Sequence, residues 1–289
     1  FQAYFDLGTN STVSQHSKMT WDLAFESSDT GYIIMLNNAR FMKIVNTGTT
    51  DFYTGVFDTT GADWKFDNVS AFPDSSAIGN WADIIINPIQ SYNLVYALDL
   101  GMDDEGNQLG FRKIQFVSYS DSFYFFRYAM LDGGQPDSFY IKKDQSKNFS
   151  YFSFKNGGQQ LIIEPDKDKW DLLFTQYTTI LYTDLGEAVP YLVLGVLQNP
   201  DRVEAAVLKN SDFNSVVFDQ VITLPYSRKQ DVIGYEWKKY NFSSGIYEVT
   251  TTNTYIIKDT DGFLYKLRFI SFYNAQGDKG YPNFEVQKL

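Results

Sequence analysis

The stretch Trp21-Asp22-Leu23-Ala24-Phe25 decides the fold of this chain, because it returns as Trp170-Asp171-Leu172-Leu173-Phe174. Solenoid repeats are ~20–50 residues long, so a period of about half the chain indicates a duplicated domain. Three further pairs of stretches keep the same order at nearly the same spacing: residues 4–7 with 151–154, 66–69 with 218–221, and 113–119 with 266–272.

The length of the chain suits this duplication. Domains commonly contain ~100–200 residues, and the chain has 289. A polar, charged stretch at residues 142–148 is suited to a linker between the two copies. We therefore predict two homologous domains in tandem, residues 1–145 and residues 146–289, which we refer to as the first and the second copy.

The composition and the local patterns predict strands. Aromatic residues make up 18% of the chain, and they favour the pleated, half-buried surface of a sheet. Residues 266–272 alternate, so that Leu267 and Phe269 are expected on one face and Phe272 on the other. Residues 123–130 form an almost continuous apolar run, which is typical of a strand buried on both faces or of one with an exposed aromatic face.

Turn signals complete this pattern. Asp261-Gly262 stands between two strand-like runs and predicts a hairpin, because both residues tolerate positive φ. Glu105-Gly106 takes the corresponding place in the first copy, and residues 199–207 are expected to form a short helix after Pro200. The predicted fold class is all-β, with mostly antiparallel sheets and few short helices.

Charge and cysteine content exclude several classes of protein. The formal net charge is -11 and no basic stripe is present, whereas a nucleic-acid binder needs cationic groups to displace counterions from phosphates. No apolar run approaches the ~20 residues of a membrane-spanning helix. Cysteine is absent, which excludes disulfides and thiolate chemistry. The sequence begins with Phe1, from which we expect that a leader, with any lipid-anchor cysteine, has been removed.

Candidate catalytic groups are few. His16 is the one histidine, and it stands in a polar run, residues 11–18, that we expect to be a solvated loop. The duplicated Asp22 and Asp171 could form a catalytic pair, but a motif kept in both copies more often serves the fold. Glycoside hydrolysis needs two carboxylates that face each other at roughly 5–9.5 Å, which spacing along a sequence does not show. We therefore expect a binding protein rather than an enzyme, with a hydrolase as the alternative.

Metal and cofactor ligands are equally sparse. The acidic stretch at residues 99–105 could hold calcium, but its spacing departs from the EF-hand pattern, so an acidic hairpin tip is expected instead. Thioethers can ligate haem iron. Met35 and Met42 flank a segment that could lie near a pocket, and with His16 they are the candidate cofactor ligands, packing being the alternative role for the methionines. No metal site is predicted.

The second copy carries a series of motifs in a recognisable order. They are Ile233-Gly234-Tyr235-Glu236-Trp237, Thr254-Tyr255-Ile256-Ile257-Lys258-Asp259, Tyr265-Lys266-Leu267-Arg268-Phe269 and Gly280-Tyr281-Pro282, with a weaker match in the first copy at Ile78-Gly79-Asn80-Trp81. This series resembles the HmuY-like family, outer-membrane or secreted lipoproteins of Bacteroidetes, some of which capture haem. The resemblance implies an almost all-β fold, export and lipid anchoring.

The resemblance does not carry over a haem site. The best-known members hold the iron between two histidines, and this chain has one. Some relatives are thought to use methionines, which keeps Met35 and Met42 as candidates. We expect an exported ligand-binding lipoprotein at the cell surface or in the periplasm, with haem or another small molecule as ligand and a TonB-type outer-membrane receptor as partner.

A second function remains open at this point. Exposed aromatic side chains would favour a glycan-binding or adhesion module of a surface uptake system. Since the residues shared by the two copies are expected to serve the fold, the binding site is expected in the divergent loops, at residues 37–63 and 184–210.

Overall fold

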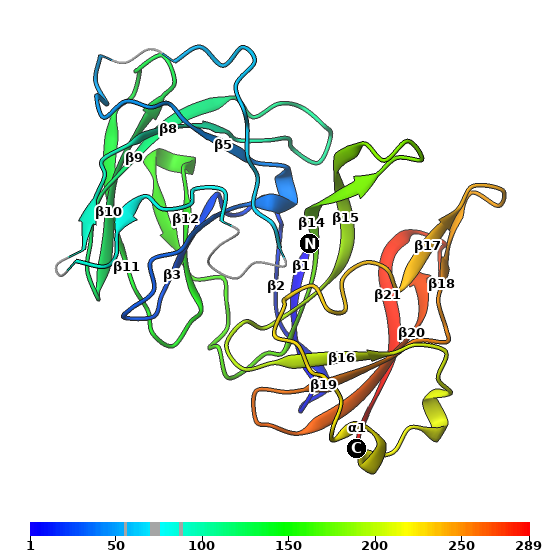
Figure 1. Ribbon diagram of the computed structural model, residues 1–289. Helices are drawn as coiled ribbons and strands as arrows, with labels where there is room; N and C mark the ends of the chain where they lie inside the picture. The colour runs from blue at the N-terminus through cyan, green and yellow to red at the C-terminus, as the bar shows by residue number, and fades with distance from the viewer. Residues whose placement is uncertain (55–56, 70–75, 87–88) are drawn as a thin grey trace. The chain divides into compact units, whose positions relative to one another are not determined.

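The computed structural model describes residues 1–54, 57–69, 76–86 and 89–289, and strands dominate it (Figure 1). The strands of the first copy are β1 (Gln2–Asp6), β2 (Ser11–His16), β3 (Leu23–Glu26), β4 (Ile34–Leu36), β5 (Lys43–Asn46), β6 (Ala82–Asp83), β7 (Gln90–Ser91), β8 (Val95–Asp99), β9 (Phe111–Tyr119), β10 (Phe123–Met130) and β11 (Asp137–Lys142). Those of the second copy are β12 (Phe149–Ser153), β13 (Gln159–Leu161), β14 (Leu172–Tyr182), β15 (Ala188–Gln198), β16 (Glu204–Leu208), β17 (Lys238–Asn241), β18 (Ile246–Val249), β19 (Thr254–Lys258), β20 (Leu264–Tyr273) and β21 (Lys279–Lys288).

Helical structure is short in the described residues. It consists of α1 (Phe218–Val221) and the 3-10 turns η1 (Asn38–Arg40), η3 (Lys155–Gly157) and η4 (Phe213–Ser215). The predicted all-β class with few short helices is therefore confirmed. No helix in the described ranges is long and apolar enough to span a membrane.

The chain forms two compact units, which differ from the two copies in the sequence. The N-terminal unit consists of His16–Glu164 and Gln176–Leu192, and the C-terminal unit of Phe1–Gln15, Pro165–Thr175 and Val193–Leu289. The predicted domains, residues 1–145 and 146–289, thus do not coincide with the compact units.

An exchange of first strands explains this difference. Strand β1 belongs to the first copy, but it pairs with β14, which begins in the Trp-Asp motif of the second copy, and Tyr4 lies opposite Leu173. Strand β12 belongs to the second copy, but it pairs with β3 of the first, and Phe152 lies opposite Leu23. Each copy therefore supplies its first strand to the unit that holds the other copy's Trp-Asp motif.

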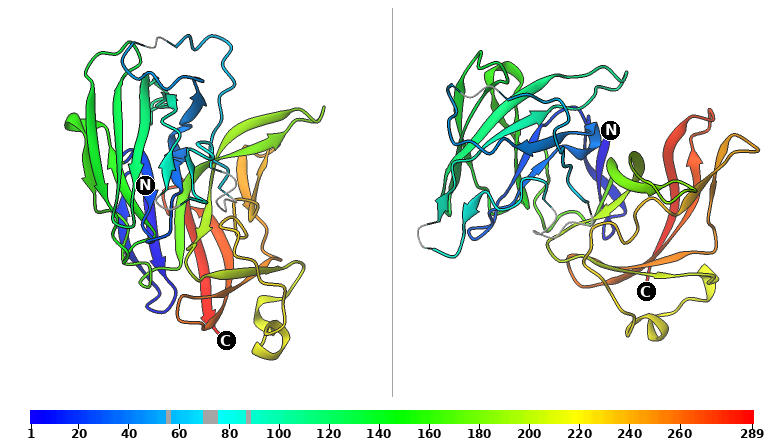
Figure 2. Two further views of the ribbon diagram at one scale, coloured as in Figure 1. Left: turned by 60° about the vertical axis from the view of Figure 1, so that its left-hand side comes forward. Right: turned by 45° about the horizontal axis from the view of Figure 1, so that its top comes forward.

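The sheets repeat one strand order. The N-terminal unit contains the sheets β11-β10-β9-β8-β5, β13-β12-β3-β4 and β6-β7. The C-terminal unit contains β16-β19-β20-β21, the hairpin β17-β18, and most of β15-β14-β1-β2 (Figure 2). The order β5-β8-β9-β10 in the first copy thus recurs as β16-β19-β20-β21 in the second, which agrees with a duplication.

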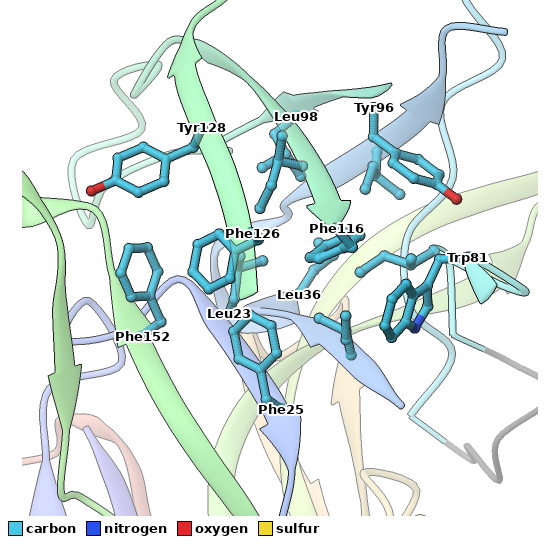
Figure 3. Close-up of a cluster of buried hydrophobic side chains, with 14 of the residues drawn as sticks. Leu23, Phe25, Leu36, Trp81, Tyr96, Leu98, Phe116, Phe126, Tyr128 and Phe152 are labelled. Atoms are coloured by element: carbon cyan, nitrogen blue, oxygen red, sulfur yellow. The ribbon is translucent and has the colours of Figure 1, made fainter. Parts of the chain in front are cut away.

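An aromatic core fills the N-terminal unit between two of its sheets (Figure 3). Phe25 of β3 stacks on Phe126 of β10, with 5.2 Å between the ring centroids, and Phe152 of β12 meets Phe126 edge-on at 5.0 Å. Trp81 closes the same core against Phe116 of β9 at 5.6 Å. Such pairs contribute about 0.5–1.5 kcal/mol each beyond the area that they bury.

The C-terminal unit repeats this core, with one departure from the predicted faces. Trp237, the counterpart of Trp81, stacks on Phe269 of β20 at 4.0 Å. Phe272 also contacts Trp237, at 5.6 Å, although alternation places it on the opposite face from Phe269. The pairing of β20 with β21 shifts register between Phe269 and Ser271, and such a bulge returns the following side chains to the core.

Of the other local predictions, some are confirmed and some are wrong. Strand β10 spans residues 123–130 as predicted, and Gly262 takes a φ of 89° in the turn between β19 and β20. The predicted helix at residues 199–207 is wrong, because residues 204–208 form β16 and pair with β19. The predicted loop at residues 11–18 is wrong in its first part, which forms β2 at the edge of its sheet, where polar side chains are common.

Candidate functional site

Asp22 of the duplicated motif holds the N-terminal unit together. Its buried carboxylate accepts hydrogen bonds from the amide of Phe154 at 2.7 Å and the hydroxyl of Ser153 at 2.9 Å. The guanidinium of Arg40, itself buried, pairs with the other oxygen. Asp22 thus fixes β12 of the second copy beside the motif of the first.

Asp171 repeats this role in the C-terminal unit with different partners. Its carboxylate accepts from the amides of Leu7 at 2.8 Å and Thr260 at 3.0 Å. Burial raises the pKa of Asp171 to about 6, although the two amide bonds oppose the shift. The position of Leu7 in the first copy corresponds to that of Phe154 in the second, so both units use the same bond. The two aspartates lie in different units, and each binds groups of its own unit, which favours a structural role for both.

The three candidate ligands predicted from the sequence, His16, Met35 and Met42, lie in different surroundings. His16 ends β2, where its Nδ1 lies 3.0 Å from the carbonyl of Ser17, and burial lowers its pKa. Met42 is fully buried, and Arg40 donates a hydrogen bond to its sulfur at 3.0 Å. Met35 packs on a separate cluster that contains Trp21. None of the three lines the cavity described below.

The acidic stretch at residues 99–105 uses its carboxylates for its own structure. Asp99 pairs with Lys43 at 3.2 Å, and Asp104 pairs with Lys18 at 2.9 Å. Asp103 accepts hydrogen bonds from the amides of Glu105 and Asn107 within the turn. In the part of the chain that the structure describes, no three acidic or histidine side chains are grouped to hold a metal.

A cavity of about 230 Å³ lies in the N-terminal unit, beside strands β8 and β9. Four of its described lining residues come from the divergent segment 37–63, in which the sequence predicts a binding site. Its volume is below the ~300–1,000 Å³ of pockets for drug-sized ligands, and it equals that of roughly seven to eight waters in the liquid. The described lining residues are Thr47, Thr49, Asp51, Phe57, Val95, Lys113 and Leu131.

Lys113 is the cationic group among the described lining residues. The residue is 4% exposed, and its ammonium lies 5.1 Å from the ring of Phe52. No described oxygen accepts a hydrogen bond from it, and no described carboxylate lies within ion-pair distance. A buried ammonium without an acceptor is costly, because its three N–H groups have lost water. An acceptor bound in the cavity that Lys113 lines would remove this cost.

Lys266 occupies the equivalent position of the second copy and has two described acceptors. It is 3% exposed, and its ammonium donates to the carbonyls of Phe213 at 2.8 Å and Val216 at 3.0 Å. The ring of Phe213 lies 4.7 Å from the ammonium, as Phe52 does at Lys113. The two copies therefore keep the lysine and the aromatic ring, and among the described residues only Lys266 has carbonyl acceptors from its own loop.

The other polar groups of the cavity differ in their remaining capacity for hydrogen bonds. The hydroxyl of Thr47 donates to the carbonyl of Val95 at 2.7 Å and is thereby used. The hydroxyl of Thr49 accepts from the amide of Asp51 at 3.0 Å, which leaves its proton free to donate. The Asp51 carboxylate accepts from the hydroxyl and amide of Thr54 and the amide of Tyr53, and these bonds lower its pKa.

A repeat that was not among the predicted pairs of stretches marks this loop. Asp51-Phe52-Tyr53-Thr54 at the cavity resembles Asp212-Phe213-Asn214-Ser215, and Phe57 and Phe218 follow at the same spacing. The predicted pair 66–69 and 218–221 conceals it, because those segments differ in structure. Asp67 is fully buried, whereas Asp219 is exposed in α1.

The family follows from comparison with known proteins. The model of the HmuY protein family matches residues 1–130 and 145–286. The chain belongs to the HmuY family. The two matched regions confirm the predicted tandem arrangement, and they agree with the recurring strand order of the two units.

Other comparisons add little to this result. No curated protein matches the chain. The crystal structure of a "putative lipoprotein" from Bacteroides fragilis NCTC 9343 is similar at 17% sequence identity and a TM-score of 0.26. The similarity covers 59% of this chain and 91% of that one.

The described cavity does not fit haem. Haem iron takes imidazole, thiolate, thioether or phenolate ligands, and the described lining residues supply none of these. Met42 is committed to Arg40 in the core, and His16 ends a strand elsewhere in the chain. The volume is also below that of pockets for ligands far smaller than a porphyrin.

Proposed function

We propose that this HmuY-family chain is an exported, lipid-anchored binding protein that takes a small molecule into the cavity beside Lys113. Family membership supports the export, the anchor and the binding role. The observation that carries the site is a single one: a lysine that is 4% exposed has its ammonium beside a cavity and no described acceptor. A ligand that accepts from this ammonium removes the cost of burying it.

The lining favours binding over catalysis. Hydrolysis by paired carboxylates needs two such groups, and Asp51 is the one carboxylate among the described lining residues. A nucleophile needs an adjacent base, and neither threonine of the lining is bonded to a histidine or a carboxylate. The cavity instead combines a few polar groups with an apolar wall, which is the usual make-up of a small-molecule site.

Isothermal titration calorimetry with three small-molecule sets tests this proposal: amino acids, monosaccharides and short-chain carboxylates. We expect at least one set to bind, and Thr49→Phe to abolish the binding by filling the cavity. Thr60→Phe is the matched control, because Thr60 is exposed in the same segment and does not line the cavity. Binding to no set, or equal binding by both variants, would contradict the proposal.

Haem is tested in the same series. Since the described lining offers no iron ligand, we expect no shift of the Soret band when haem is added to the wild-type protein. A saturable Soret shift that disappears in Met35→Ala, Met42→Ala or His16→Ala would instead restore the haem function that the family resemblance suggests.

A glycan-binding function is the second candidate, and one surface feature favours it. The hairpin β17-β18 carries Phe242, which is 91% exposed, and Tyr240, which is 44% exposed, with 5.1 Å between their rings. Exposed aromatic faces can stack on sugar rings. On a glycan array, this function requires hits that are lost in a Tyr240→Ala/Phe242→Ala variant and kept in Tyr281→Ala, which removes an exposed ring of β21.

A further inference from the structure

We propose that the ligand of the cavity is a small zwitterion of the amino-acid type, whose carboxylate binds Lys113 and whose ammonium binds Asp51. This inference rests on the proposed function and adds the chemical class of the ligand. It follows from the opposite charges of the two lining side chains and from the apolar remainder of the wall.

The carboxylate end of the ligand is selected by two donors. The Lys113 ammonium has no described acceptor, and the Thr49 hydroxyl has a proton to donate because its oxygen already accepts from Asp51. Two donors of this kind suit the two oxygens of one carboxylate, and charge-assisted bonds are roughly twice as strong as neutral ones. A neutral sugar hydroxyl would leave the buried ammonium without a counter-charge.

The ammonium end is selected by Asp51. Three donors already bond to its carboxylate, two amides to one oxygen and the Thr54 hydroxyl to the other. A carboxylate offers about four lone-pair sites, so one remains for the ligand. These bonds hold the group ionised, and its negative charge would repel a ligand that is purely anionic.

Asp51 and Lys113 do not cancel each other. The structure shows no ion pair between these two described side chains, although the charge of Lys113 is near enough to help lower the pKa of Asp51. Two opposite charges on one cavity, held apart, match a ligand that carries both signs a few bonds apart. Phe57, Val95 and Leu131 complete the wall and suit an apolar side chain.

Calorimetry with matched probes tests the class of the ligand. The probes are the twenty amino acids, then leucine against 4-methylpentanoate, which lacks the ammonium, and 3-methylbutylamine, which lacks the carboxylate. We expect one or more amino acids to bind, and each analogue of the best binder that lacks one charge to bind at least tenfold more weakly. The absence of binding by all amino acids, with binding by a monosaccharide or a simple carboxylate, overturns the zwitterion and leaves the proposed function in place.

Two variants assign the ends of the ligand. Asp51→Asn is expected to weaken amino-acid binding at least tenfold and to leave binding of the deaminated analogue within twofold, because the asparagine oxygen still accepts from Tyr53 and Thr54. Lys113→Met is expected to weaken both probes at least tenfold. Asp58→Asn, an exposed aspartate of the same segment outside the lining, is the control. Equal losses for both probes in Asp51→Asn overturn the assignment, and thermal unfolding of each variant shows that it is folded.

Discussion

Lys113 and Lys266 stand at the same position of the two copies, and their surroundings differ in one respect. Both are buried, in the corresponding strands β9 and β20 of the recurring sheets, and both lie against an aromatic ring. Lys266 donates to two carbonyls of its own loop, whereas Lys113 faces a cavity. The difference supports our proposal that one lysine of this duplicated pair binds a ligand, whereas the other holds its own loop.

The duplicated aspartates show the opposite behaviour. Asp22 and Asp171 keep the same backbone partner in each unit, the amide of Phe154 and that of Leu7. Their other partners differ, because Arg40 and the Ser153 hydroxyl bind Asp22 and the Thr260 amide binds Asp171. The two aspartates therefore serve the fold in both copies, because every described partner that they have belongs to their own unit.

The largest loss of stability is expected when the duplicated aspartate is replaced in either copy. Asp22→Ala leaves the buried Arg40 without its counter-charge, which costs about 3–5 kcal/mol. Asp171→Ala leaves two buried amides without an acceptor, which costs about 1–3 kcal/mol. Urea unfolding followed by tryptophan fluorescence measures both, with exposed Asp132→Ala expected within about 0.5 kcal/mol of wild type. Losses below 1 kcal/mol in both variants would show that the aspartates do not hold the strands.

Lys238, a buried lysine that the first copy lacks, is expected to make stability depend on pH. Lys238 follows Trp237, where the first copy has Ala82 after Trp81, and its ammonium lies 4.2 Å from the Trp237 ring and donates to the carbonyl of Leu194. Burial lowers the pKa of Lys238 to about 7. The unfolded chain therefore holds this proton between about pH 7 and 10.5 while the folded chain has released it.

Stability of the C-terminal unit should consequently rise with pH across this window, by about 1–3 kcal/mol from Lys238 alone. Lys238→Met should remove this rise, and Lys239→Met, at an exposed neighbour, should keep it. Unfolding in urea at pH 7 and pH 9.5 is the measurement. The same slope in wild type and Lys238→Met would mean that the buried ammonium keeps its proton.

Particular residues show which features of the fold could be predicted from the sequence. The Trp-Asp repeat and the ordered motifs predicted the family, the all-β class and the tandem arrangement. Strand β10 and the Asp261-Gly262 turn followed from apolar runs and from the tolerance of positive φ, which are local properties. The side of Phe272 did not follow, because a bulge between β20 and β21 depends on the partner strand.

The features that the sequence did not predict depend mainly on pairing between strands that are far apart in the chain. Nothing local in β1 or β12 indicates that each pairs with the motif of the other copy, since strand partners are chosen by the whole fold. The prediction that a site lies in segment 37–63 gave four residues of the cavity lining, but Lys113 was assigned to the fold because it is duplicated. His16, Met35 and Met42 stay candidate ligands, and none of them lies at the cavity.

The central claim is that one lysine of the duplicated pair serves a ligand and the other serves the fold. Lys113→Met and Lys266→Met, each measured for urea stability and for binding of the best amino-acid probe, test it most directly. We predict that Lys266→Met loses about 1–3 kcal/mol, because two carbonyls lose their donor, and keeps its affinity. Lys113→Met should lose less than about 0.5 kcal/mol or become more stable, and its affinity should fall at least tenfold. Equal losses of stability in the two variants, with affinity unchanged in Lys113→Met, would contradict the account.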